Sequence, residues 1–183
     1  MPPQMVILIR HAEKPVEHGP QGFTHEGKPD PHSLTAAGWQ RSGALIRYFN
    51  PQAGEAPPSG LPLPDHVMAV HYDPAKDSDT RRPKQTVHEL ARSLGVKLDD
   101  RFAKGQEKAL AEDIRGLSGC VLVCWAHELI PAILEAMGVA RAVIPPWPED
   151  RFDLVWILTL QEDRWTFRQQ AQMLMPGDSA VLP

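Results

Sequence analysis

The chain has 183 residues, 42% of them hydrophobic, which is enough for one sizeable core and short for two, so we expect a single domain over residues 1–183. The formal net charge of −4 leaves no basic footprint, and nucleic acid is therefore not expected as a partner. No apolar run approaches the roughly 20 residues that cross a bilayer, and the N-terminus lacks a signal-peptide pattern. These features predict a cytoplasmic protein without a membrane partner.

Strand-like and helix-like segments alternate along the first half of the chain. Residues 6–9 form a short run rich in β-branched residues, typical of a strand buried on both faces. Residues 19–32 are dense in Gly, Pro and His and predict a loop. From Ser33 or Thr35 onwards, apolar residues recur at near-helical spacing behind a plausible cap, which predicts a helix. Residues 50–65 carry five prolines and two glycines and predict another loop.

The second half continues the same alternation. A strand is expected at 67–72, then a helix at 82–95 with Pro83 in its first turn and Gly95 as its stop. The segment "GCVLVCWAH" predicts a third strand and "LIPAILEAMG" the helix that follows it. Two final strands, "DLVWILTL" and "RWTFRQQ", are expected to pair around a turn. Alternating strands and helices predict an α/β fold with a mostly parallel sheet covered on both faces.

Basic residues and histidines gather where three of the predicted strands end. Arg10 and His11 follow the first strand, Arg82 follows the second, and His127 and Glu128 follow the third. Ligands of open α/β sheets bind beyond the carboxyl ends of the strands, so neighbouring strands would bring these residues to one rim. Arginine forks match phosphate oxygens, and a helix N-terminus adds backbone N–H donors. The pattern predicts a phosphate site beside two histidines.

A histidine beside a bound phosphate can act as a nucleophile. It must present an unprotonated nitrogen while its other nitrogen donates to a fixed acceptor. We assign this role to His11. Arg10, Arg82 and His127 would then neutralise charge on the phosphoryl oxygens as the group moves. A carboxylic acid is also required to protonate the leaving oxygen.

Four segments, in this order, resemble motifs of the histidine phosphatase superfamily, the phosphoglycerate mutase-like proteins. "LIRHAEKP" is similar to its Arg-His-Gly signature, with Ala12 in place of the glycine. "SLTAAGWQRS" resembles a Leu-Thr-x-x-Gly-x-x-Gln segment, with Arg41 at the place of the glutamine. "SDTRRPKQT" is similar to a Ser-x-x-x-Arg-Ala-x-Gln-Thr segment and points to Arg82 instead of Arg81. "VLVCWAHELIPAIL" resembles the strand and helix that present the second histidine.

The resemblance implies a three-layer α/β/α sandwich with a mostly parallel central sheet, and no metal or other cofactor. It implies that His11 becomes phosphorylated, within a pocket completed by Arg10, Arg82 and His127. The proton donor has two candidates. Mutase-type members take it from a glutamate in the middle of the chain, here Glu107. Acid-phosphatase-type members have an acidic residue directly after the second histidine, here Glu128, which we favour.

Three further residues are candidates for contact with the rest of the substrate. Lys14 follows the first histidine closely and could meet an anionic group, although surface lysines are usually only solvated. Trp147 and Arg151 lie in the Pro-stiffened segment "PPWPEDRFD" and could line the pocket.

The sequence therefore predicts a metal-independent phosphomonoester hydrolase that acts through a phosphohistidine on a small phosphorylated substrate or a phosphoprotein. A mutase is the alternative within the same superfamily, but a chain this short supplies little material for a closing lid. A non-catalytic phosphate-binding or phosphoprotein-binding module is the alternative outside catalysis. His11 and His127 argue against it, because binding alone needs the arginines more than two histidines.

Overall fold

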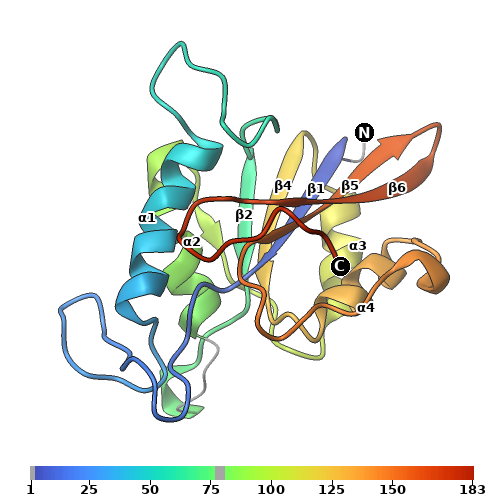
Figure 1. The fold of residues 1–183 in the computed structure, drawn as a ribbon. Coiled ribbons are helices and arrows are strands. Elements are labelled where there is room, and N and C mark those ends of the chain that lie inside the picture. Colours follow the sequence, from blue (N-terminus) through green and yellow to red (C-terminus); the bar gives the residue numbers. More distant parts are fainter. Residues whose placement is uncertain (1–2, 77–80) are drawn as a thin grey trace.

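The protein is built around a six-stranded sheet, seen in a computed structural model that describes residues 3–76 and 81–183 (Figure 1). The strands are β1 (Met5–Arg10), β2 (His66–Ala69), β3 (Leu98–Asp99), β4 (Cys120–Trp125), β5 (Leu154–Gln161) and β6 (Arg164–Ala171). Their order is β3-β2-β4-β1-β5-β6. The first four strands are parallel, whereas β5 runs antiparallel to β1 and β6 antiparallel to β5. The expected mostly parallel sheet is confirmed.

Helices cover both faces of this sheet. They are α1 (Ala36–Phe49), α2 (Arg81–Leu94), α3 (Glu107–Arg115) and α4 (Ile130–Ala136), with short 3₁₀ turns η1 (Pro74–Lys76) and η2 (Arg141–Val143). Figure 1 shows α1 and α2 together on one side of the sheet and α3 and α4 on the other. This arrangement is the three-layer α/β/α sandwich that the sequence predicted.

Strand β1 lies at the centre of the sheet and contributes to both cores. Val6 and Leu8 pack into the cluster that holds the buried residues of α3 and α4. Ile7 and Ile9 point the opposite way, into the cluster that holds those of α1 and α2. All four side chains are fully buried, which explains why the run is continuously apolar instead of alternating.

Local signals for helix ends and turns agree with the structure. Thr35 caps α1, its side-chain oxygen accepting from the Gly38 amide at 3.2 Å. Helix α2 ends just before Gly95, which takes the left-handed conformation (φ +71°) that glycine adopts without strain. Strand β2 is shorter than expected, because it ends at Ala69 and not at Tyr72. Strand β3 and helix α3 were not among the predicted elements.

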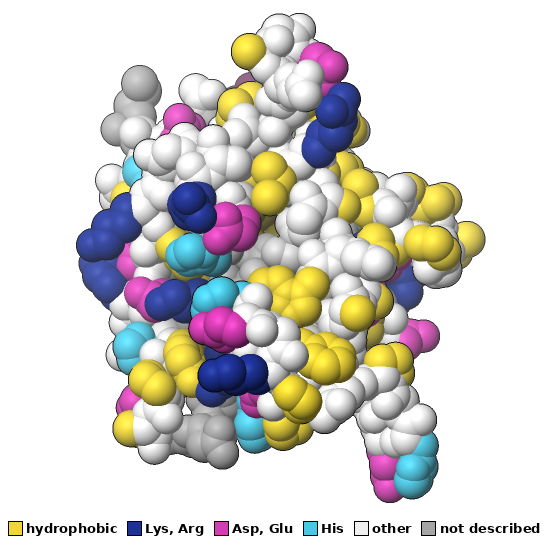
Figure 2. Space-filling view, turned by 90° about the vertical axis from the view of Figure 1, so that its left-hand side faces the viewer, with side chains coloured by type: hydrophobic (Ala, Val, Ile, Leu, Met, Phe, Trp, Pro, Cys, Tyr) yellow, Lys and Arg dark blue, Asp and Glu magenta, His cyan; other side chains and the backbone are white. Residues whose placement is uncertain are grey.

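The face formed by α1 and α2 is charged but of mixed sign. On the side shown in Figure 2, basic, acidic and histidine side chains are interspersed among the described residues. Ion pairs contribute to this pattern, such as Arg47 with Glu55 at 3.0 Å and Arg92 with Glu89 at 3.3 Å. Every helix in the described part of the chain is too short or too polar to span a bilayer.

Candidate active site

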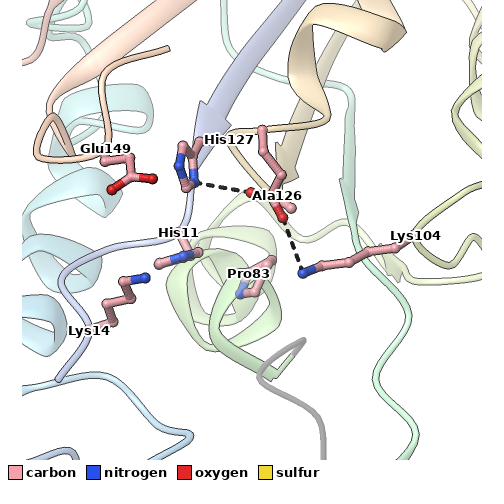
Figure 3. Close-up of a pocket in the computed structure, with 8 residues that line it drawn as sticks. His11, Lys14, Pro83, Lys104, Ala126, His127 and Glu149 are labelled. Carbon is pink, nitrogen blue, oxygen red and sulfur yellow. Dashed lines mark hydrogen bonds and ion pairs between the residues drawn. The ribbon is translucent and has the colours of Figure 1, made fainter. Parts of the chain in front are cut away.

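A pocket opens where β1 and β4 end side by side. Arg10 pairs with Trp125 in the parallel register, so the residues that follow each strand emerge at the same rim. The cavity measures about 230 Å³ (Figure 3). Its walls are formed by His11, Lys14, Pro83, Lys104, Ala126, His127, Glu128 and Glu149. Four of the sequence-predicted site residues, namely His11, Lys14, His127 and Glu128, therefore line one cavity.

His11 is held as a neutral ring with one free nitrogen. Its Nδ1 lies 2.7 Å from the carbonyl oxygen of Ala12, and because a carbonyl can only accept, Nδ1 carries the proton. The unprotonated nitrogen is then Nε2. Burial of the ring, together with the positive charges of Arg10 and Arg82, lowers the pKa of His11 to about 3. An imidazole in this state is equipped to act as a nucleophile at neutral pH.

Arg10 is a buried cation with unused donors. Its Nη1 donates to the backbone carbonyls of Glu149 at 2.6 Å and Arg151 at 3.3 Å, and the guanidinium lies 4.0 Å from the ring centre of Phe152. Its Nε and Nη2 have no hydrogen-bond partner among the described residues. Burial lowers the pKa of Arg10 to about 10, so it remains charged at neutral pH. Unpaired buried donors are costly, and an anion is the partner that suits them.

Arg82 lies in the first turn of α2 and is almost fully buried. Its Nη2 donates to the carbonyl of Pro31 at 2.9 Å, and its own carbonyl accepts from the Thr86 hydroxyl at 2.8 Å. The same Thr86 oxygen accepts from the amide of Ala12 at 2.9 Å, which ties α2 to the residue after His11. Arg10 and Arg82 do not themselves line the cavity, but both charges act on the His11 ring. Ser78, in the same predicted motif, lies outside the described residues.

His127 and Glu128 form a polar cluster with Lys104 on the cavity wall. Glu128 Oε2 lies 3.1 Å from His127 Nδ1, and Glu128 Oε1 lies 3.4 Å from Lys104 Nζ, as the dashed lines in Figure 3 show. Burial and the charge of Arg10 lower the pKa of His127. Partial burial opposes ionisation of Glu128, but its backbone amide and the charges of Lys104 and His127 outweigh it and hold the pKa of Glu128 below its usual range.

Glu107, the other candidate proton donor, is not brought to the cavity. Its side chain is 7% exposed, and Oε1 accepts hydrogen bonds from the Trp125 indole at 3.1 Å and the Gly105 amide at 3.0 Å. These contacts give it a role in joining the start of α3 to the end of β4.

Trp147 and Arg151, which the sequence suggested as residues that could line the pocket, are likewise not among the residues that form the cavity wall. Trp147 packs on Trp156 with ring centres 4.8 Å apart, and its indole N–H donates to the Arg151 carbonyl at 2.9 Å. The Arg151 side chain binds Asp153 at 2.7 Å and the backbone carbonyls of Ser179 and Val181, both at 2.8 Å. The segment that holds Trp147 and Arg151 instead supports Arg10, because the backbone carbonyls of Glu149 and Arg151 accept hydrogen bonds from it.

Glu149 lines the cavity and was not predicted. It lies in the loop before β5, and because β5 is antiparallel to β1, the start of β5 lies at the rim where β1 ends. The antiparallel pairing of β5 with β1 is the feature that could have indicated that Glu149 lies at this rim. Among the described residues, no three His, Cys, Asp or Glu side chains come together as a metal ion would require.

Comparison with solved structures identifies a protein of the same architecture. A putative α-ribazole-5′-P phosphatase from Escherichia coli aligns with a TM-score of 0.52 at 11% identity, over 91% of this chain and 95% of that one. The two chains share a fold. A putative phosphohistidine phosphatase, SixA, from Agrobacterium tumefaciens aligns at 16% identity and a TM-score of 0.49, over 91% of this chain and 95% of that one. Neither a protein-family model nor a curated protein sequence matches the chain.

Proposed function

We propose that the protein is a phosphomonoester hydrolase of the histidine phosphatase superfamily, acting through a phosphohistidine at His11. The observation that carries the proposal is the state of that ring: neutral, with Nδ1 engaged by a carbonyl and Nε2 unprotonated. Beside it lies the Arg10 guanidinium, buried and with two donors unused among the described residues. A neutral nucleophile beside a buried cation, whose positive charge helps to hold the ring unprotonated, suits phosphoryl transfer.

In the first step, His11 Nε2 attacks the phosphorus of the bound monoester. A P–N bond forms, the P–O bond to the leaving group breaks, and the leaving oxygen takes a proton from a carboxylic acid. Arg10, Arg82 and His127 stabilise the negative charge on the three remaining oxygens. In the second step, water attacks the phosphohistidine, the P–N bond breaks with its electron pair returning to Nε2, and inorganic phosphate leaves.

Two carboxyl groups on the cavity wall, Glu128 and Glu149, are candidates for the proton donor. The cavity of about 230 Å³ has room for a phosphoryl group and part of the molecule that carries it. The remainder of the substrate would rest at the rim, where Lys14 and Lys104 can meet an anionic group. A small phosphorylated metabolite, such as the ribazole phosphate named for the structural neighbour, and a phosphoprotein both fit this geometry.

Turnover of p-nitrophenyl phosphate, with EDTA and no added metal near pH 6, tests the proposal. The wild-type protein is compared with His11→Ala and with His25→Ala, an exposed histidine of the 19–32 loop that serves as the matched control. We expect activity in the wild type and in His25→Ala only, with an acid-labile phosphoryl group trapped on the active proteins. Activity that survives in His11→Ala would refute the mechanism. Phosphate binding without turnover in any variant would favour a binding module, and transfer to an added alcohol in preference to water would favour a mutase.

A further inference from the structure

The proton donor is the one part of the proposed reaction for which the cavity offers two candidates. Glu128 and Glu149 come from different segments, one following β4 and the other preceding β5. A general acid must hold a proton when the P–O bond breaks, and it must be free to give that proton to the leaving oxygen. The two carboxyl groups differ in the partners that surround them.

Glu128 has a nitrogen partner close to each of its two carboxyl oxygens. One of its oxygens lies 3.1 Å from His127 Nδ1 and the other 3.4 Å from Lys104 Nζ, so both oxygens face positive or potentially positive groups. The same contacts keep the pKa of Glu128 below its usual range and favour the carboxylate form. A carboxylate held in this way is better placed to orient the His127 ring than to donate a proton.

Glu149 is not engaged in this way. Its carboxyl group makes no hydrogen bond and no ion pair with any of the described residues, although its charge acts on Arg10 and His127 from a distance. Figure 3 shows it at the cavity beside His127. Its backbone, in contrast, is fixed, because its carbonyl oxygen accepts from Arg10 Nη1 at 2.6 Å. Arg10 thus holds the backbone of Glu149, which fixes the point from which its side chain reaches the cavity.

We propose that Glu149 is the general acid of the reaction and that Glu128 is a positioning residue for His127; the inference rests on the proposed function. As His11 Nε2 bonds to phosphorus, the electron pair of the breaking P–O bond passes to the leaving oxygen, which takes the proton of the Glu149 carboxyl group. The resulting carboxylate then accepts a proton from the water that attacks the phosphohistidine. This returns the proton to Glu149 and completes the cycle.

Leaving-group dependence of kcat/KM provides the test. An acid matters little when the leaving group is a stable anion such as p-nitrophenolate and much more when it is the basic phenolate ion. For these substrates kcat/KM covers the steps up to P–O cleavage and loss of the leaving group, so hydrolysis of the phosphohistidine, which comes later, does not enter it. The proteins compared are the wild type, Glu149→Gln, Glu128→Gln and Asp150→Asn. Asp150→Asn is the matched control, because it removes the same charge from the adjacent exposed residue, which does not line the cavity.

We expect Glu149→Gln to lose on the order of 100-fold in kcat/KM with phenyl phosphate and less than about threefold with p-nitrophenyl phosphate. Asp150→Asn should match the wild type on both substrates. Glu128→Gln should lose by the same factor on both, because an altered His127 affects the phosphoryl group and not the leaving oxygen. Equal losses for both substrates in Glu149→Gln, or no loss, would overturn the inference, as would the leaving-group pattern appearing in Glu128→Gln instead. Should His11→Ala retain activity, the proposed function itself fails, which is a separate result.

Discussion

Two glycines of α1 give a sharp test of how the helix is seated against the active site. Gly38 and Gly43 are both helical, but Gly38 is buried and Gly43 is exposed. A Cβ built on Gly38 would lie 2.5 Å from the carbonyl oxygen of Glu13 and 3.1 Å from its amide nitrogen, whereas a Cβ on Gly43 would meet nothing within 4 Å. Glu13 follows the nucleophile by two residues, and its carbonyl also accepts from the amide of Thr35 at 3.0 Å.

Because the two glycines lie in opposite environments, substitution by alanine is expected to change stability in opposite directions. Gly43→Ala should stabilise the protein by about 0.5–1 kcal/mol, the usual gain for alanine over glycine inside a helix. Gly38→Ala has the same helical gain, but its methyl group meets backbone atoms that cannot rotate away, and such overpacking costs about 1–3 kcal/mol. We therefore expect a net loss of stability for Gly38→Ala, with a fall in kcat/KM as residues 12–13 shift beside His11.

Urea unfolding of the wild type and both variants, followed by turnover of p-nitrophenyl phosphate, measures both effects. The Gly43→Ala variant controls for helix propensity, since it makes the same chemical change in the same helix. If Gly38→Ala proved as stable and as active as Gly43→Ala, the close seating of α1 on the chain after His11 would be refuted.

Three further changes test the supports of the site. Thr86→Val removes the acceptor of the buried Ala12 amide and should cost about 1–3 kcal/mol of unfolding free energy, most of it restored by Thr86→Ser; a neutral Thr86→Val would contradict the role of this bond. The pKa of His11 is about 3 in the folded protein and 6.5 ordinarily, so between these pH values the unfolded chain binds a proton that the folded protein does not. The free energy of unfolding should therefore fall as pH drops from 6.5 towards 3, and it should fall less steeply in His11→Gln. Equal slopes for the two proteins in urea titrations would contradict the low pKa of His11. Arg151→Ala should loosen the backbone carbonyls that hold Arg10. KM should then rise more than kcat falls, and inorganic phosphate should become a weaker competitive inhibitor. An effect on kcat alone would contradict this supporting role of Arg151.

The sequence predicted those parts of the fold that depend on local signals. The apolar run of β1 is legible because both of its faces are buried, and Thr35 and Gly95 mark helix ends by their own conformational preferences. That His11 and His127 meet at one cavity was also predictable, since each follows a strand and the two strands are parallel neighbours.

The contribution of the 145–153 loop could not be read in this way. Its contact with Arg10 joins residues 139 positions apart and uses backbone carbonyls, which any residue type could supply. The side chains of Trp147 and Arg151 are of types that can bind a substrate. In the structure, however, Trp147 packs on Trp156 and Arg151 binds Asp153. Glu149 carried no motif, and only the antiparallel direction of β5 brings it to the rim.

The central place of β1 has a consequence for how the protein is made. β1 precedes the other strands of this sheet in the chain, but its partners are β4 and β5, which begin at Cys120 and Leu154. At about 5–20 residues per second, a ribosome needs on the order of ten seconds to supply β4 after β1 has emerged. Throughout that interval the chain carries an unpaired strand with two open edges, apolar from Met5 to Ile9. Recognition by a chaperone during translation, and slow refolding of the isolated protein, are thus expected from the order of the strands alone.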